Sequence, residues 1–180
     1  MPVVYLCLGS NLGDRRIHIK KALALISERA GKIHALSDFR ETQPWGYHSQ
    51  KWYLNVAVAV ETKLTPEELL TVTQEIELHL GRREKTVNSK YRDRVMDIDI
   101  LLYGDLILQT PSLTVPHPLM HQRTFVLQPL SEIAPSRLIH PVLGKTVDEL
   151  LQQLYGIKTV EVQKSVPEWV SPATRKKSKP

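Results

Sequence analysis

Residues 52–61, WYLNVAVAVE, form the clearest strand in this chain. Leu54 and three valines alternate along it with Tyr53, Asn55 and two alanines. Successive side chains of a strand point to opposite faces of a sheet, so the two sets lie on different faces. This alternation predicts a strand that contributes side chains to both faces of a sheet.

Helices are predicted before and after this strand. The earlier helix covers about Arg15 to Ala30, with Asp14 as its N-terminal cap and Gly31 at its end. In the later one, Thr65-Pro66-Glu67-Glu68 has the pattern of a capping box with proline at the first helical position. It opens a helix that stops at Gly81.

Three further segments are predicted to be strands. They cover Val3 to Gly9, Ile33 to Arg40 and Val95 to Tyr103. Gly104-Asp105 has the composition of a hairpin turn that leads into Leu106 to Gln109. The resulting order is strand–helix–strand–strand–helix–strand, followed by a hairpin.

This order predicts the α+β class, with a ferredoxin-like antiparallel sheet and helices covering one face of it. A C-terminal hairpin and C-terminal helices complete the fold. The helices are expected around His121 to Glu132, bent at Pro129, and over Thr146 to Leu154. A doubly wound parallel sheet needs a helix after nearly every strand, and residues 33–61 contain no helical pattern.

Positive charge is concentrated at one end of the chain. The 180 residues carry a net charge of +5, of which residues 164–180 account for +4 and residues 1–163 for +1. A basic, polar segment with prolines is typical of a flexible tail. We therefore predict one domain over residues 1–163 and a flexible tail over 164–180, with no nucleic acid as partner.

Composition also argues against membrane and secreted classes. No stretch approaches the roughly 18 apolar residues of a membrane span. Met1 leads into apolar residues without a basic flank or a small-residue cleavage site, which is typical of a mature cytoplasmic start. Cys7 is the single cysteine, so an internal disulfide framework and a multi-cysteine metal site are excluded.

Asp97 and Asp99 are the strongest chemical signal. Spaced by two on a strand, their carboxylates emerge on one face. Two carboxylates this close repel each other unless a cation lies between them, and their oxygens are ligands that Mg²⁺ prefers. The alternative is a solvent-facing strand end whose acids pair with nearby arginines.

The preceding segment, residues 82–94, contains six cations and only two acids. Cations beside a carboxylate pair are what a metal–polyphosphate complex needs, although a solvated loop has the same composition. Together the two features favour a nucleotide. The six cations are Arg82, Arg83, Lys85, Lys90, Arg92 and Arg94.

Other candidates are weaker by themselves. The chain has no G-x-G-x-x-G loop. His117 and His121 have a spacing that suits zinc, but no third ligand is evident near them in the sequence. Trp45, Tyr53 and Phe125 are able to stack on a flat ring or to pack in the core.

Several motifs nevertheless occur together, in a fixed order, between residues 3 and 155. They are LGSNLG at 8–13, TQPWG at 42–46, YLN at 53–55, Glu77 with Gly81-Arg82, RVMDID at 94–99 and VPHPLMHQRTFVL at 115–127. In this order and spacing the chain resembles the 6-hydroxymethyl-7,8-dihydropterin pyrophosphokinase family of folate biosynthesis.

The resemblance implies transfer of pyrophosphate from ATP to the hydroxymethyl group of 6-hydroxymethyl-7,8-dihydropterin, with release of AMP. It implies two Mg²⁺ ions on Asp97 and Asp99, and catalytic roles for Arg82, Arg94 and both acids. The implied pterin-binding residues are Thr42, Pro44, Trp45, Tyr53, Asn55 and Phe125. The implied ATP-binding residues are Glu77, Arg82, Arg94, Ile100, Thr114, His117 and Arg123.

Alternatives to this assignment remain open. Arg92 competes with Arg94 for the place of the catalytic arginine before the acid pair. A ferredoxin-like RNA-binding module, a phosphotransferase that releases ADP and a non-catalytic binding protein are the rival functions. We expect a cytoplasmic monomer whose partners are its small-molecule substrates.

Overall fold

The structure, a computed structural model, describes residues 1–81 and 93–164, with side chains up to residue 156. Five strands form one antiparallel sheet in the order β2-β4-β1-β5, with β3 also paired to β4. They are β1 (Val3–Ser10), β2 (Lys32–Leu36), β3 (Arg40–Thr42), β4 (Tyr53–Glu61) and β5 (Asp97–Tyr103). The predicted α+β class with a ferredoxin-like antiparallel sheet is confirmed.

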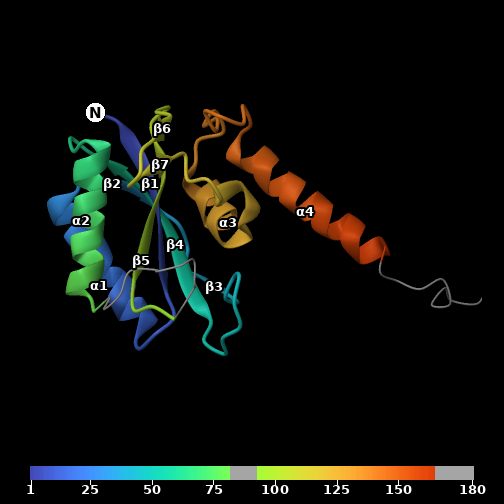
Figure 1. The fold of residues 1–180 in the computed structure, drawn as a ribbon, viewed down its shortest axis with the longest axis horizontal. Helices are drawn as coiled ribbons and strands as arrows, with labels where there is room; N and C mark the ends of the chain where they lie inside the picture. The colour runs from blue at the N-terminus through green and yellow to red at the C-terminus, as the bar shows by residue number, and fades with distance from the viewer. Residues whose placement is uncertain (82–92, 165–180) are drawn as a thin grey trace, which may run out of the picture.

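Two helices cover the first face of the sheet, α1 (Arg15–Arg29) and α2 (Pro66–His79) (Figure 1). Both predicted caps form. An Asp14 carboxylate oxygen accepts from the Ile17 amide at 3.0 Å. In the capping box, the Thr65 amide donates to Glu68 at 2.7 Å and the Glu68 amide donates to the Thr65 hydroxyl at 3.2 Å.

The second face of the sheet is covered too, which the sequence did not predict. A short 3₁₀ turn (Met120–Gln122) leads into α3 (Thr124–Ile133), and α4 (Val147–Lys164) packs beside α3 (Figure 1). The prediction that helices cover one face was therefore wrong. The physical reason is that β1 and β4 are apolar on both faces, so each face must be buried. The buried side chains of the second face include Tyr5, Cys7, Ala57, Ala59, Leu101, Leu127 and Leu130.

The strand predicted over Ile33 to Arg40 is divided into β2 and β3. Ser37 interrupts it, because the Ala57 amide donates to the Ser37 hydroxyl oxygen at 2.9 Å instead of to a backbone carbonyl. The next amide, that of Asp38, donates to Glu132 on α3 at 2.8 Å. A side-chain acceptor and a distant carboxylate thus replace the regular ladder.

The C-terminal hairpin differs from the prediction in its partner. Residues Leu108–Gln109 (β6) pair with Thr114–Val115 (β7) and not with β5. The outer edge of β5 is bonded elsewhere, since the Leu101 carbonyl accepts from the His117 amide at 2.9 Å. The helix predicted from His121 begins at Thr124 and contains Pro129, and α4 continues past the predicted end at Leu154.

None of the helices in the described part of the chain combines the length and apolar character that a membrane crossing requires.

Candidate active site

The acid pair lies near the start of β5, facing the second side of the sheet. Asp97 is paired with Gly9 on β1, and Asp99 with Cys7. The Asp97 and Asp99 side chains are 28% and 30% exposed. Because the residues opposite them on β1 are small, the carboxylates stand over open space rather than against packed side chains.

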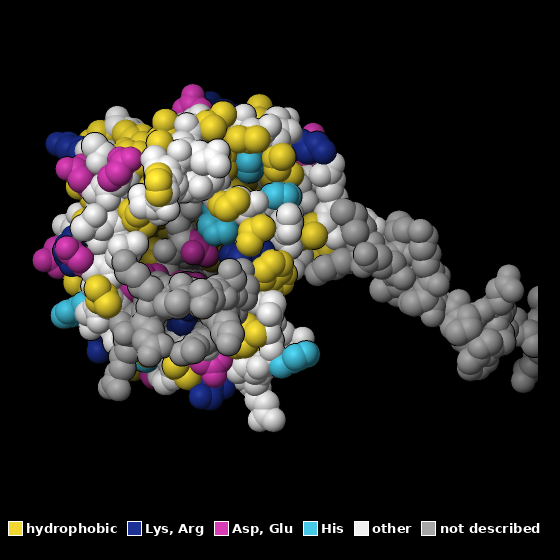
Figure 2. All heavy atoms as spheres, viewed as in Figure 1, with side chains coloured by type: hydrophobic (Ala, Val, Ile, Leu, Met, Phe, Trp, Pro, Cys, Tyr) yellow, Lys and Arg dark blue, Asp and Glu magenta, His cyan; other side chains and the backbone are white. Residues whose placement is uncertain are grey.

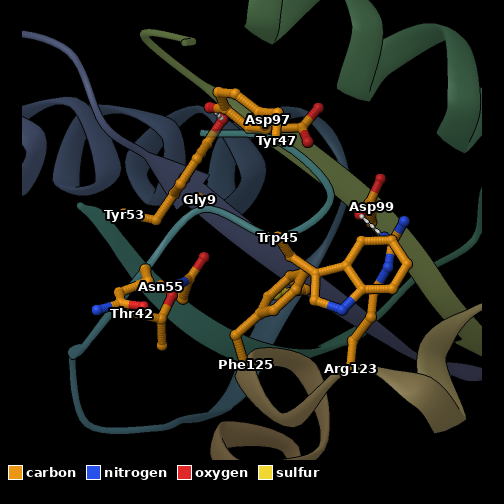
Figure 3. A pocket seen from close by; sticks show the side chains of 12 residues that line it. Gly9, Thr42, Trp45, Tyr47, Tyr53, Asn55, Asp97, Asp99, Arg123 and Phe125 are labelled. Atoms are coloured by element: carbon orange, nitrogen blue, oxygen red, sulfur yellow. Dashed lines mark hydrogen bonds and ion pairs between the residues drawn. The ribbon is translucent and has the colours of Figure 1, made fainter. Parts of the chain in front are cut away.

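Basic side chains hold both acids. An Arg94 nitrogen lies 2.5 Å from Asp97. An Arg123 nitrogen lies 3.6 Å from Asp99 (Figure 3). His117 approaches Asp99 at 4.0 Å through Nε2, while its Nδ1 accepts from the Leu119 amide at 3.1 Å. The pairing of the acids with arginines, which the sequence left as an alternative, is therefore present.

Glu77 of α2 fixes the backbone between the two acids. Its side chain is buried, and Oε1 accepts from the Ile98 amide at 2.8 Å. A buried carboxylate that accepts a backbone N–H at this distance holds the strand edge in place. The contact places Glu77 beneath the acid pair, as part of its support.

The electrostatics of the pair suit a cation. Loss of water and the negative charge of Asp97 raise the pKa of Asp99 to about 7. Burial and the neighbouring Arg123 lower the pKa of His117 to about 4, so this imidazole is neutral at pH 7. Two partly exposed carboxylates on one strand face provide hard oxygen ligands with room for further oxygens, and these residues fit Mg²⁺.

No group of three His, Cys, Asp or Glu side chains that could hold a metal occurs within residues 1–81 and 93–156. His117 contacts Asp99, whereas the His121 ring lies beside the Gln122 amide at 3.3 Å. The zinc arrangement suggested by the spacing of these histidines is thus not formed by the described side chains.

An aromatic pocket opens on one side of the acid pair (Figure 3). Trp45 and Phe125 both lie beside Arg123, whose guanidinium is 4.8 Å from the Trp45 ring and 5.7 Å from the Phe125 ring. At the back, the Asn55 amide donates to the Thr42 hydroxyl at 2.6 Å. Flat walls with a few polar groups suit a planar heterocycle.

A second cleft opens on the other side of the acid pair. Its walls come from α2, from the start of β5 and from the segment after β7, and it continues along β5. Figure 2 shows acidic side chains set into a hollow of the surface, with histidine and basic side chains at its rim. The residues predicted for ATP that line this cleft or its continuation are Glu77, Arg94, Ile100, Thr114, His117 and Arg123.

Most predicted site residues are thereby brought together. Thr42, Trp45, Tyr53, Asn55 and Phe125 all line the aromatic pocket. Pro44 does not line it, although Gln43 and Trp45 on either side of it do. Arg82 lies outside the described residues, and so does Arg92, the alternative to Arg94.

Asn11 is a site residue whose role the sequence analysis missed. Its side chain is 3% exposed, and Oδ1 accepts from the Arg94 amide at 2.6 Å. The backbone amide of Asn11 donates to the Arg94 carbonyl at 3.0 Å. The available signal was an asparagine inside the LGSNLG motif, which the sequence analysis used for the family resemblance without giving Asn11 a role.

Comparison with known proteins gives a consistent result. A family model described as 7,8-dihydro-6-hydroxymethylpterin-pyrophosphokinase matches residues 5–135. A 2-amino-4-hydroxy-6-hydroxymethyldihydropteridine pyrophosphokinase from Porphyromonas gingivalis is 47% identical over 142 residues, covering 78% of this chain and 95% of the relative. The enzyme of the same name from Bacillus subtilis is 43% identical over 132 residues, covering 73% and 77%.

Solved structures agree at the level of the fold. A Plasmodium falciparum HPPK-DHPS crystal structure superposes with a TM-score of 0.72 at 16% identity. The match covers 93% of this chain and 46% of that one, so this chain spans less than half of the Plasmodium chain.

Proposed function

We propose, from the premise that this chain belongs to the 7,8-dihydro-6-hydroxymethylpterin-pyrophosphokinase family, that the two clefts beside Asp97 and Asp99 receive its two substrates. The chain is an ATP-dependent pyrophosphokinase of folate biosynthesis. It transfers pyrophosphate from ATP to the hydroxymethyl group of 6-hydroxymethyl-7,8-dihydropterin, and AMP leaves.

One observation carries the assignment of the site: Asp97 and Asp99 line both the aromatic pocket and the second cleft. A pyrophosphoryl transfer needs the acceptor hydroxyl and the β-phosphorus of ATP to meet at one point. The acid pair is common to both clefts, so that point lies beside it.

The aromatic pocket is the proposed pterin site. Tyr53 and Phe125 line it from β4 and α3, and they would stack on the ring. Asn55 and Thr42 would read the donors and acceptors of the ring edge, together with the backbone at Pro44 and Trp45. The Asn55–Thr42 hydrogen bond of 2.6 Å fixes the orientation of that amide before a ring enters.

The second cleft is the proposed ATP site. Arg94 and Arg123 approach the acid pair and would bind phosphate oxygens, and Arg82 is proposed to join them. Asp97 and Asp99 would hold two Mg²⁺ ions, which when bound neutralise charge on the entering and leaving oxygens. His117 is neutral and would act as a hydrogen-bonding group rather than a cation.

The organisation of the chain is part of the proposal. We propose one catalytic domain over residues 1–163, because the described helices pack on the two faces of a single sheet. The segment 164–180 is proposed as a flexible tail on its composition. A monomer in the cytoplasm is the proposed state, on the sequence alone.

A product assay tests the function. The protein is mixed with ATP, Mg²⁺ and 6-hydroxymethyl-7,8-dihydropterin, and the nucleotides are separated. We expect AMP that depends on the pterin and disappears when a chelator removes Mg²⁺. ADP would indicate an ordinary phosphotransferase. Absence of turnover by folded protein would favour a binding module, and salt-sensitive RNA affinity carried by residues 164–180 would favour the RNA-binding alternative.

The pterin site is tested by Tyr53→Ala, with Tyr103→Ala as a control outside both clefts. We expect weaker pterin binding in the first variant by about tenfold, because one stacking face is lost, and unchanged ATP binding. Equal pterin affinity in Tyr53→Ala and the wild type would refute the stacking role.

A further inference from the structure

Asp93, immediately before Arg94, makes contacts that none of the proposed roles explains. Its Oδ1 accepts from Asn11 Nδ2 at 2.8 Å and from the Tyr47 hydroxyl at 3.1 Å. Its other oxygen lies 3.7 Å from Lys51 Nζ. The carboxylate therefore joins the turn after β1 to two residues of the loop between β3 and β4.

The same loop forms a wall of the aromatic pocket. Trp45 and Tyr47 both line the pocket, and the hydroxyl oxygens of Tyr47 and Tyr53 lie 3.1 Å apart in a hydrogen bond. Figure 3 shows Tyr47 beside Asp97, at the end of the pocket opposite Phe125. The hydrogen bond to Asp93 thus helps to fix the position of Tyr47, and Tyr47 forms part of the pocket wall.

Arg94 is tied to the same group of contacts. Asn11 Oδ1 accepts from the Arg94 backbone amide at 2.6 Å, and the Asn11 backbone amide donates to the Arg94 carbonyl at 3.0 Å. Asn11 Nδ2 donates to Asp93. The Lys51 carbonyl also accepts from Asn11 Nδ2, at 3.2 Å. The Arg94 guanidinium in turn lies 2.5 Å from Asp97. A continuous set of hydrogen bonds therefore connects the loop of the aromatic pocket with the arginine on the acid pair.

The carboxylate of Asp93 is charged in this network. Partial burial raises its pKa, but hydrogen bonds from Ser49, Asn11 and Tyr47 outweigh burial, and the pKa lies below its usual value. A charged acceptor makes stronger hydrogen bonds than a neutral one. The loop is accordingly held by an anion that contacts Tyr47 of the aromatic pocket and precedes Arg94 of the second cleft.

We infer that Asp93 is a positioning residue that fixes loop 43–51 and Arg94 relative to each other, so that pterin binding and the placement of Arg94 on Asp97 are coupled. This inference rests on the proposed site. It assigns Asp93 and Tyr47 no contact with the reacting atoms. Their effect reaches the reaction through Arg94 and through the wall of the pocket.

A double-mutant cycle tests the inference in the full chain. The variants are Asp93→Ala, Tyr47→Phe and the double variant, with Asp93→Asn as the conservative change. Asp105→Ala is the matched control, because it removes an exposed aspartate at the opposite end of β5. For each protein we would measure kcat, the pterin KM, and the pterin Kd with and without Mg²⁺ and a non-hydrolysable ATP analogue.

We expect Asp93→Ala and Tyr47→Phe each to lower kcat/KM for the pterin about tenfold, and the double variant to lose little more, because both remove one network. The ratio of the pterin Kd without Mg²⁺ and the ATP analogue to the pterin Kd with them should move toward 1 in Asp93→Ala. Binding of the nucleotide would then no longer change the affinity for the pterin. Asp93→Asn keeps an acceptor oxygen and should retain most of the ratio. A merely structural role would lower the melting temperature without changing this ratio.

Independent effects would overturn the inference, that is, losses that multiply in the double variant or an Asp93→Ala protein with the ratio of the wild type. If Asp93→Ala does not fold, Tyr47→Phe decides, because it removes one hydroxyl and keeps the ring. Asp97→Ala distinguishes a failure of the proposed active site from a failure of the proposed role of Asp93. Turnover by Asp97→Ala would refute the proposed site itself. If Asp97→Ala is inactive while the Asp93 variants behave like the wild type, only the inference about Asp93 is refuted.

Discussion

The two faces of the sheet are built from the same strands but differ in the size of their side chains. On β1, Leu6 and Leu8 point to the face under α1 and α2, whereas Cys7 and Gly9 point to the other face. On β4, valines alternate in the same way with alanines and Asn55. The first face is filled throughout. The second is filled under α3 and α4 and becomes empty toward the acid pair.

This difference separates stability from chemistry. Large aliphatic side chains on the first face bury apolar area and hold the strands in register. Small side chains on the second face leave the space that becomes the aromatic pocket. Because the same strands carry both faces, the acid pair stands on a rigid base although its own surroundings are open. The predictions below test this separation, starting with the largest effect.

Asp97→Ala should abolish most activity without unfolding the protein. Removal of a metal-binding carboxylate next to the reacting atoms should lower kcat/KM by about a thousandfold or more. The side chain is partly exposed and contributes nothing to the filled face, so the urea midpoint should change little. Steady-state AMP formation and urea unfolding measure the two effects. Near-normal turnover would contradict the role of the acid pair.

Leu6→Ala should have the opposite profile. Leu6 is fully buried on the filled face, and its truncation should cost about 2–5 kcal/mol of unfolding free energy through the cavity it leaves. Activity per folded molecule at low temperature should remain near that of the wild type. Leu78→Ala on the exposed surface of α2 is the matched control and should cost far less. Equal losses in both variants would show that the first face is not the stabilising one.

Gly9→Ala should fill the empty end of the second face. A Cβ atom at this position would lie 2.9 Å from Asn55 Oδ1 and 3.4 Å from the Tyr53 ring. Asn55 and Tyr53 would have to move, so the pterin KM should rise by about tenfold, in line with a loss near 1.4 kcal/mol. The ATP KM should change less. An unaltered pterin KM would mean that the pocket tolerates a methyl group and is not shaped by Gly9.

Asp99→Asn should make the ligand-free protein more stable above pH 7. The pKa of Asp99 is about 7 in the folded chain against an ordinary value of 3.8 for an aspartate, so folding favours the protonated acid. Its stabilising contribution is complete below the lower value and is lost as the pH rises through 7. Thermal melts from pH 5 to 9 should show Asp99→Asn losing less stability than the wild type, by about 1 kcal/mol after allowance for partial exposure. If stability falls with pH equally in Asp99→Asn and the wild type, the raised pKa of Asp99 is refuted.

Much of the fold was readable because its signals are local. Asp14, the Thr65–Glu68 capping box and the alternation along β4 each act within a few residues, and all three appear as predicted. The division of the strand at Ser37 was not readable, because it depends on Ala57, twenty positions away. The C-terminal helices were predicted, but their place on the second face of the sheet was missed. That place follows from the apolar side chains on both faces of β1 and β4, which the sequence analysis did not use.

The sequence by itself determined β1, β4 and β5, the helix caps and the presence of two acids on one strand face, because these follow from spacing and from the chemistry of neighbouring residues. Only the tertiary structure decided that Asp97 and Asp99 stand between two clefts. It also decided that Asn11 meets Tyr47 and Arg94, which lie 36 and 83 positions away in the chain. Hydrogen bonds at such separations form only after the sheet has brought their partners together, so no local pattern encodes them.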